Sequence, residues 1–120
     1  MSTTDTGVTI VPYFKVQQGQ LESFKKLCEQ CVEITTSEDK CLYYGFSFDD
    51  HNAHCREGYT DAEGLLIHLD AIGPLLGDLL QIADLSSLEV HGPEGELAKL
   101  REPLAELNPT FFTLEYGFRR

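Results

Sequence analysis

The sequence predicts an α+β domain of the ferredoxin-like, split βαβ type, in which helices cover one face of an antiparallel sheet. Three observations predict this fold. Segments with strand-like and helix-like patterns follow one another in the order β-α-β-β-α-β. Both helical segments carry an apolar stripe at the i, i+3 and i+4 spacing of an amphipathic helix. The two strands between them are separated by only a short polar turn, which indicates a hairpin.

The first half of the chain supplies four of these elements. Residues 8–16 are β-branched and aromatic, which is typical of a strand. Residues 21–34 have the apolar stripe of a helix. Residues 41–48 and 53–59 are the two strands of the predicted hairpin.

The second half of the chain begins with the longer helix. Thr60 or Asp61 is a good N-cap for it, and its leucines and isoleucines follow a helical stripe. Gly73-Pro74 interrupts the stripe, so a kink is expected there, with a new helix starting at Pro74. Residues 87–92 form the next predicted strand.

Two further elements are appended to this pattern. Pro93 starts a shorter predicted helix that reaches residue 107, and Pro103 is expected to bend or divide it. Residues 111–118 are rich in aromatics and are predicted to form a last strand. No linker divides the chain, so we expect one domain over residues 8–120 after a flexible lead at residues 1–7.

Composition narrows the classes of function. The formal net charge of −11 would repel nucleic acids and anionic membranes, so neither is an expected partner. No apolar run reaches the ~18 residues of a membrane span. The first residues do not combine a basic region with an apolar core, as a signal peptide does. We therefore expect a cytoplasmic protein.

The four cysteines include a C-x-x-C motif that needs an interpretation. Cys28 and Cys31 extend the apolar stripe of the first helix, far from its beginning, whereas a redox C-x-x-C normally opens a helix. We therefore predict buried, reduced core thiols. A zinc site that adds His51 and His54 is the alternative, but its H-x-x-H pair is a weak match. No metal is expected.

Helices on one face of a sheet leave its other face open. We expect that open face to present aromatic side chains such as Tyr44, Phe46 and Phe14. So much apolar surface normally needs a second cover. Two copies packed sheet to sheet would supply it, and they would enclose a pocket between sheet and helix. The sequence therefore predicts a homodimer.

Chemically active residues gather where the third strand meets the second helix. Glu57 and Tyr59 alternate onto one face of the strand, which stops at Thr60-Asp61. His68 follows Asp61 by seven residues, close to two helical turns, so it returns to the face on which the helix begins. The spacing predicts an acid, a phenol and an imidazole at a pocket between this helix and the sheet.

These residue types suit proton transfer with a small molecule. An imidazole can take a phenol proton near neutral pH, so His68 is a candidate base. Glu57 is a candidate to orient that imidazole or to accept a hydrogen bond from the substrate. A deprotonated, electron-rich ring can pass an electron to O2 directly, so neither a metal nor a flavin is needed. In the structural alternative, His68 and Glu57 bond to each other or to the backbone and fix the corner.

The same corner resembles a known family, the antibiotic-biosynthesis-monooxygenase-like proteins. In that family a strand ending in Glu and an aromatic residue runs into a helix bearing a His. The matching residues are Arg56-Glu57-Gly58-Tyr59, then Asp61-Ala62-Glu63, then His68. The likeness covers residues 8–90, and the segment 93–107 is an addition to the family pattern. The chain lacks the Asn, Trp and His set of the haem-degrading branch, and it has no tryptophan.

The resemblance implies a dimeric α+β barrel and a cofactor-independent monooxygenase that acts on a small aromatic or quinol-like metabolite. The chemistry of the corner itself makes His68 and Glu57 the candidate catalytic residues. The candidates for holding a quinol-like ring are Tyr43 or Tyr44, together with Tyr59, and Phe14 is a further candidate for substrate binding. The alternative is a non-catalytic dimeric module of the same fold that binds a small ligand or a protein partner.

Overall fold

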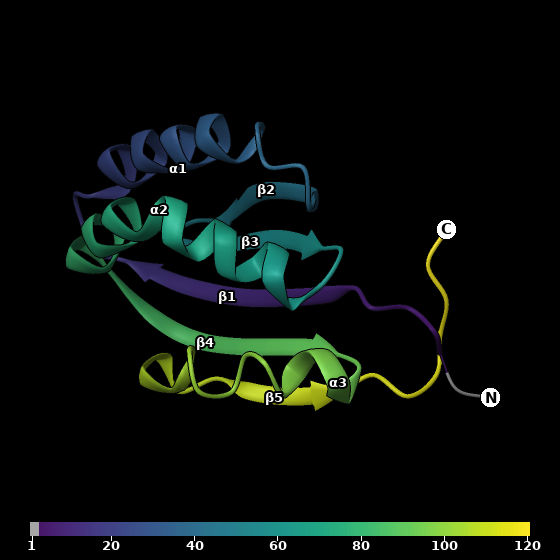
Figure 1. Cartoon of the computed structure of the whole chain (residues 1–120). Coiled ribbons are helices and arrows are strands. Elements are labelled where there is room, and N and C mark those ends of the chain that lie inside the picture. Colours follow the sequence, from purple (N-terminus) through teal and green to yellow (C-terminus); the bar gives the residue numbers. More distant parts are fainter. Residues whose placement is uncertain (1–2) are drawn as a thin grey trace.

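The computed structural model describes residues 3–120 and confirms the predicted α+β architecture (Figure 1). Met1 and Ser2, the start of the lead expected at residues 1–7, lie outside the described residues. The elements are β1 (Val8–Val16), α1 (Leu21–Thr35), β2 (Cys41–Asp49), β3 (Asn52–Tyr59), α2 (Ala62–Ile82), β4 (Ala83–Gly92), α3 (Glu94–Leu97), the 3-10 helix η1 (Ala105–Leu107) and β5 (Thr110–Thr113). One sheet holds the strands in the order β2-β3-β1-β4-β5, with α1 and α2 over the same face (Figure 1).

The sheet is mixed rather than wholly antiparallel. β1 pairs antiparallel with β3 and β4, and β2 pairs antiparallel with β3, as the split βαβ pattern predicts. The appended β5 pairs parallel with β4 and ends at Thr113 rather than at residue 118. The Leu114 N–H still donates to the Gly92 carbonyl at 2.7 Å. Beyond it β4 offers no further partner, because that strand ends at Gly92 and Pro93 has no N–H to donate.

β4 begins earlier than predicted. It starts at Ala83, directly after α2, rather than at residue 87. Ala83 pairs with Val16, and the register shifts between Tyr13 and Phe14 of β1. Residues 83–86 lack the apolar run of a typical strand, so it is pairing with β1 rather than local pattern that makes them one.

The core lies between the sheet and the two long helices. Along β1, Ile10, Phe14 and Val16 point to the helices and are buried, whereas Tyr13 and Lys15 lie exposed on the opposite face. This period of two follows from the pleat of a strand. The sheet therefore presents one apolar face to α1 and α2 and one mixed face to solvent.

The aromatic residues expected on the open face lie on the covered face instead. Tyr44 and Phe46 of β2 line a pocket under α2, together with Phe14. The hairpin register places Tyr44 directly opposite Glu57, whose side chain also points inward. Side chains directly opposite each other share a face of the sheet, so the register fixes this orientation.

α2 is one helix that runs through Pro74, whereas the sequence predicts a break there. Ile72 before the proline and Leu79 after it are both buried. Packing on both sides therefore outweighs the hydrogen bond that the proline removes.

α2 is also long and apolar enough to cross a membrane, although it contains Asp70 and Asp78. The core helix of a soluble protein can have the same length and composition, so these two properties alone are weak evidence for a membrane span.

The appended helix is much shorter than predicted. α3 covers only Glu94–Leu97, and turns carry the chain through Pro103 to η1. Leu97, Leu100 and Leu104 are nevertheless fully buried, in one cluster with residues of β1, β4 and α2. The apolar spacing thus identified the buried residues correctly although the segment is not one helix.

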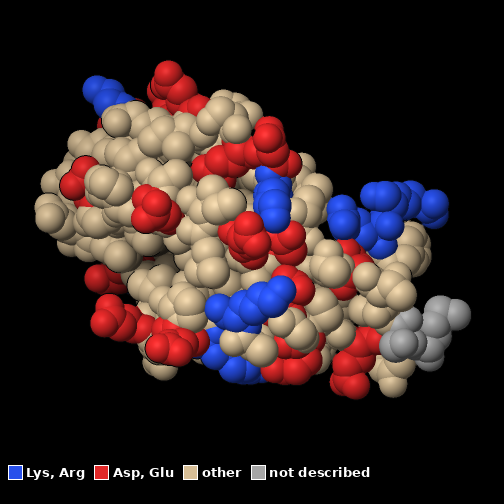
Figure 2. Space-filling model, viewed as in Figure 1, with Lys and Arg blue, Asp and Glu red and all other residues tan. Residues whose placement is uncertain are grey.

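Acidic side chains are spread over the face of the molecule seen in Figure 2. Basic side chains occupy a few separate places, one of them beside the C-terminal end. This face therefore offers little to attract a polyanion.

Cys28 and Cys31 should resist alkylation in the folded protein. Both are free and buried in the inner side of α1, and burial raises the pKa of their thiols to about 12 and about 11. The thiolate is the reactive form, so iodoacetamide at pH 8 should modify them only after unfolding, as mass spectrometry would record. Rapid labelling of the native protein, or stoichiometric zinc that is lost in Cys28→Ser, would contradict this prediction.

Candidate active site

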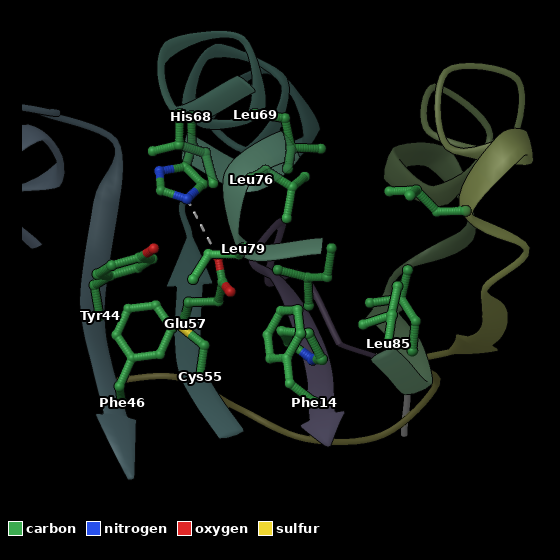
Figure 3. A pocket seen from close by; sticks show the side chains of 15 residues that line it. Phe14, Tyr44, Phe46, Cys55, Glu57, His68, Leu69, Leu76, Leu79 and Leu85 are labelled. Carbon is green, nitrogen blue, oxygen red and sulfur yellow. Dashed lines mark ion pairs between the residues drawn. The ribbon is translucent and has the colours of Figure 1, made fainter. Parts of the chain in front are cut away.

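A pocket lies between α2 and the covered face of the sheet (Figure 3). The cavity volume is about 40 Å³, enough for a few water molecules, so an organic ligand can enter only where the pocket opens to solvent or where lining side chains move. Its lining is mostly apolar and includes Phe14, Phe46, Leu69, Leu76, Leu79 and Leu85. Among the lining residues Glu57 is the only carboxylic acid and His68 the only histidine. The pocket is thus a largely apolar chamber with a single pair of acid–base groups.

The strand-to-helix corner brings these two groups together as the sequence predicts. Glu57 points into the pocket from β3, and only Thr60 and Asp61 separate the end of that strand from the start of α2. Asp61 caps α2 by accepting a hydrogen bond from the Gly64 N–H at 2.8 Å, and the Lys40 ammonium lies 3.0 Å from the same carboxylate. His68 then enters the pocket from the inner side of α2 (Figure 3).

His68 is almost fully enclosed, with 1% of its surface exposed. Its Nδ1 atom lies 3.0 Å and 3.2 Å from the two carboxylate oxygens of Glu38, and 3.4 Å from Thr35 Oγ1. Its Nε2 atom faces Glu57 Oε1 at 3.6 Å, beyond hydrogen-bonding distance. Nε2 is the one buried side-chain nitrogen or oxygen without a hydrogen-bond partner among residues 3–120. A buried polar atom without a partner is costly, and such atoms often mark a site of ligand binding or catalysis.

Glu57 is 5% exposed, and the side chains of Tyr59 and Cys55 both hydrogen-bond to it. The Tyr59 hydroxyl donates a hydrogen bond of 2.7 Å to Glu57 Oε1. The Tyr59 ring also packs against the imidazole, with 5.3 Å between ring centroids. Tyr59 therefore contacts both members of the pair, but it is not among the residues that line the pocket, where it was predicted to bind substrate.

Burial shifts the pKa of both side chains so that the neutral form of each is favoured. It raises the pKa of Glu57 from 4.5 to about 7, against the opposing effect of the hydrogen bonds from Tyr59 and Cys55. It lowers the pKa of His68 from 6.5 to about 4. Between these two values the carboxyl is protonated and the imidazole is neutral, so an acid and a base lie side by side.

The other residues predicted to bind substrate divide into two groups. Phe14 and Tyr44 line the pocket, and the Tyr44 ring contacts His68 at 4.9 Å between centroids. Tyr43 does not join the site, because consecutive residues of a strand point to opposite faces. Its ring lies on the other face of the sheet, under the Arg56 guanidinium and so close to Gly58 that a β-carbon there would clash.

Sequence reasoning missed Glu38 and Thr35. Thr35 ends α1 and continues its buried stripe four residues after Cys31, a spacing that could have identified it. Glu38 lies in the turn between α1 and β2, distant from His68 in the chain, so no local pattern identifies it. The C-terminal Leu107 also reaches the pocket. In the part of the chain that the structure describes, no three His, Cys, Asp or Glu residues lie close enough to hold a metal ion.

This fold and pocket define a ferredoxin-like α+β protein with a buried acid–base pair. No family model matches the chain, and no curated protein matches it. Among solved structures, MupZ from Pseudomonas fluorescens is similar to it at 47% sequence identity, over 95% of this chain and 94% of that chain, with a TM-score of 0.89. Two more distant structures show the same fold. One is a protein from Caulobacter crescentus provisionally assigned as an antibiotic biosynthesis monooxygenase, at 16% identity over 72% of this chain and 86% of that chain, with a TM-score of 0.63.

The second of the two more distant structures is a conserved protein from Methanosarcina mazei, at 21% identity over 72% of this chain and 89% of that chain, with a TM-score of 0.64. The identity with MupZ extends over nearly all of both chains and so shows a family relationship. The chain therefore belongs to the same family as MupZ. It also shares the fold of structures provisionally assigned as antibiotic biosynthesis monooxygenases, as the resemblance at the strand-to-helix corner predicts.

Proposed function

We propose that the protein is an enzyme that transfers a proton between its Glu57–His68 pair and a small, largely apolar metabolite. The observation that carries this proposal is the bare Nε2 of His68, which faces Glu57 without a hydrogen-bond partner at the wall of an otherwise apolar pocket. An unpartnered imidazole nitrogen can accept a proton from a ligand hydroxyl. The adjacent carboxylic acid can donate a hydrogen bond to the oxygen as its negative charge develops.

The finer proposal is a cofactor-independent monooxygenase of an aromatic or quinol-like compound. His68 would remove a phenolic proton, and the electron-rich anion would pass an electron to O2. For a hydroquinone, one oxygen atom of O2 enters the ring and the other leaves as water, so the product is a hydroxyquinone. The substrate supplies all the electrons, so the balance requires no other reductant. The apolar lining and the family relationship support this reaction.

Oxygen uptake against a panel of hydroquinones tests the finer proposal. We expect one O2 consumed for each product molecule formed, with one atom of label incorporated from 18O2. Tight binding of such compounds without any turnover would instead favour the non-catalytic module. Absence of both binding and turnover across the panel would reject this substrate class.

One observation favours a second candidate, a proton transfer without oxidation. Burial raises the pKa of Glu57 to about 7, which is where an effective general acid is placed at neutral pH. Such an acid suits isomerisation, dehydration or addition at an oxygen-bearing carbon of an apolar molecule. Turnover under nitrogen at the same rate as in air would select this candidate over the oxygenase.

We also propose a homodimer that uses the open face of the sheet. Tyr13 of β1 and Phe112 of β5 are 44% and 45% exposed there, and each stacks on a histidine, His54 and His91 respectively. Such side chains are typical of the centre of an interface. Sedimentation at micromolar concentration should therefore give the mass of two chains, and Tyr13→Glu should weaken the association. A wild-type protein that sediments as a stable monomer would contradict the proposal.

A further inference from the structure

The hydrogen atoms around His68 Nδ1 can be assigned from its neighbours. The Thr35 hydroxyl donates its hydrogen to the Cys31 carbonyl at 2.7 Å, so it offers only a lone pair to Nδ1. The Glu38 carboxylate, which contacts Nδ1 with both oxygens, accepts hydrogen bonds when ionised. Both partners of Nδ1 are therefore acceptors. A neutral imidazole between them carries its hydrogen on Nδ1.

We propose that Glu38 is a positioning residue: it holds His68 in the Nδ1–H tautomer, so that Nε2 presents its lone pair to Glu57 and the pocket. This inference rests on the proposed proton transfer at the same site. In the other tautomer Nε2 would carry a hydrogen and be unable to take a proton from a ligand. The contact with Glu38 thus decides whether His68 can act as a base.

Glu38 is well placed to do more than fix the tautomer. Besides contacting His68, it lines a second hollow, outside the apolar pocket, that also reaches Thr36 and Leu42 and opens to solvent. Its side chain is 10% exposed, so water can hydrate it while the pocket holds a ligand. When Nε2 takes a proton, the imidazolium gains an ion pair with this carboxylate. The other groups that face the ring are Glu57, Tyr44 and Tyr59.

Nitrogen NMR of the histidine side chains tests the tautomer without any substrate. The chain has four histidines, and His68→Ala identifies the signals of His68 by their loss. Wild-type protein at pH 7 should show His68 with a protonated Nδ1 and a bare Nε2. Glu38→Ala should produce a detectable fraction of the Nε2–H form, whereas Glu38→Gln, whose amide oxygen still accepts, should retain the wild-type tautomer.

Activity separates positioning from simple structural support. Glu38→Ala should lower kcat by about tenfold or more, with partial recovery in Glu38→Asp. Glu33→Ala, the same substitution at an exposed carboxylate of α1, serves as the control and should leave kcat unchanged. Circular dichroism would verify that each variant is folded.

Three results would overturn the inference. The first is a wild-type His68 that carries its hydrogen on Nε2. The second is a set of nitrogen shifts that does not change in Glu38→Ala. The third is an unchanged kcat in Glu38→Ala despite an altered tautomer. If no compound is turned over by the wild-type protein, the proposed function fails, but the NMR experiment still decides whether Glu38 fixes the tautomer.

Discussion

His68→Ala should lower kcat/KM by about 100-fold or more, the usual contribution of a positioned acid or base. The substitution removes the one nitrogen that faces both Glu57 and the pocket without a partner. No other histidine lines the pocket, so no imidazole can replace it. The measurement is turnover of the best compound in the hydroquinone panel, followed by oxygen uptake or by product formation.

The matched control is His51→Ala. His51 lies in the turn between β2 and β3, away from the pocket, and its imidazole bonds only the exposed Asp50 carboxylate. This variant should retain wild-type activity. If His68→Ala were as active as this control while remaining folded, His68 would have a purely structural role.

The second large effect is on the pH dependence of stability. As pH rises, the contribution of Glu57 to the free energy of unfolding falls and that of His68 increases. The pKa of Glu57 is higher in the folded state, so its contribution is fully present below pH 4.5 and is lost as pH rises toward 7. The pKa of His68 is lower in the folded state, so its contribution is present above pH 6.5 and is lost as pH falls toward 4. Each shift corresponds to about 3 kcal/mol.

In the wild-type protein the two effects largely cancel. Between pH 4.5 and 6.5 the unfolded chain holds one proton on His68, and the folded protein holds one on Glu57. The two states bind equal numbers of protons at this pair, so the pair adds no slope to stability there. In a variant that lacks one of the two residues, the free energy of unfolding should therefore change with pH as the remaining residue titrates.

Urea unfolding at several pH values measures these slopes. The free energy of unfolding of Glu57→Gln minus that of wild type should rise by about 3 kcal/mol from pH 4.5 to 7. The corresponding difference for His68→Ala should fall by about 3 kcal/mol from pH 4 to 6.5. Differences that stay constant with pH would mean that neither group is shifted by burial.

Much of the fold follows from the sequence because its signals are local. The apolar stripe of α1 and the polar turn between β2 and β3 predicted those elements to within a residue or two. The errors arise where distant parts of the chain decide. Packing of Ile72 and Leu79 carries α2 through Pro74, and pairing with β1 extends β4 to Ala83. Lack of a partner strand ends β5 at Thr113.

The candidate site was predictable only in part, for the same reason. Glu57, Tyr59 and His68 lie at one corner of the chain, so strand alternation and helical period place them together. Tyr43 was grouped with Tyr44, although neighbours on a strand face opposite ways. Glu38 reaches His68 across thirty residues of sequence, a contact that only the packing of α1 against α2 creates.

The pH dependence of kcat/KM is the most direct test of a catalytic Glu57–His68 pair. The active form has a neutral imidazole and a protonated carboxyl, so activity should rise above pH about 4 and fall above pH about 7. Because the two groups interact, the two apparent pKa values of this profile describe the pair rather than either residue alone. In Glu57→Gln the alkaline limb should disappear from whatever activity remains. A profile that stays flat from pH 4 to 9, or one whose alkaline limb survives in Glu57→Gln, would contradict the account.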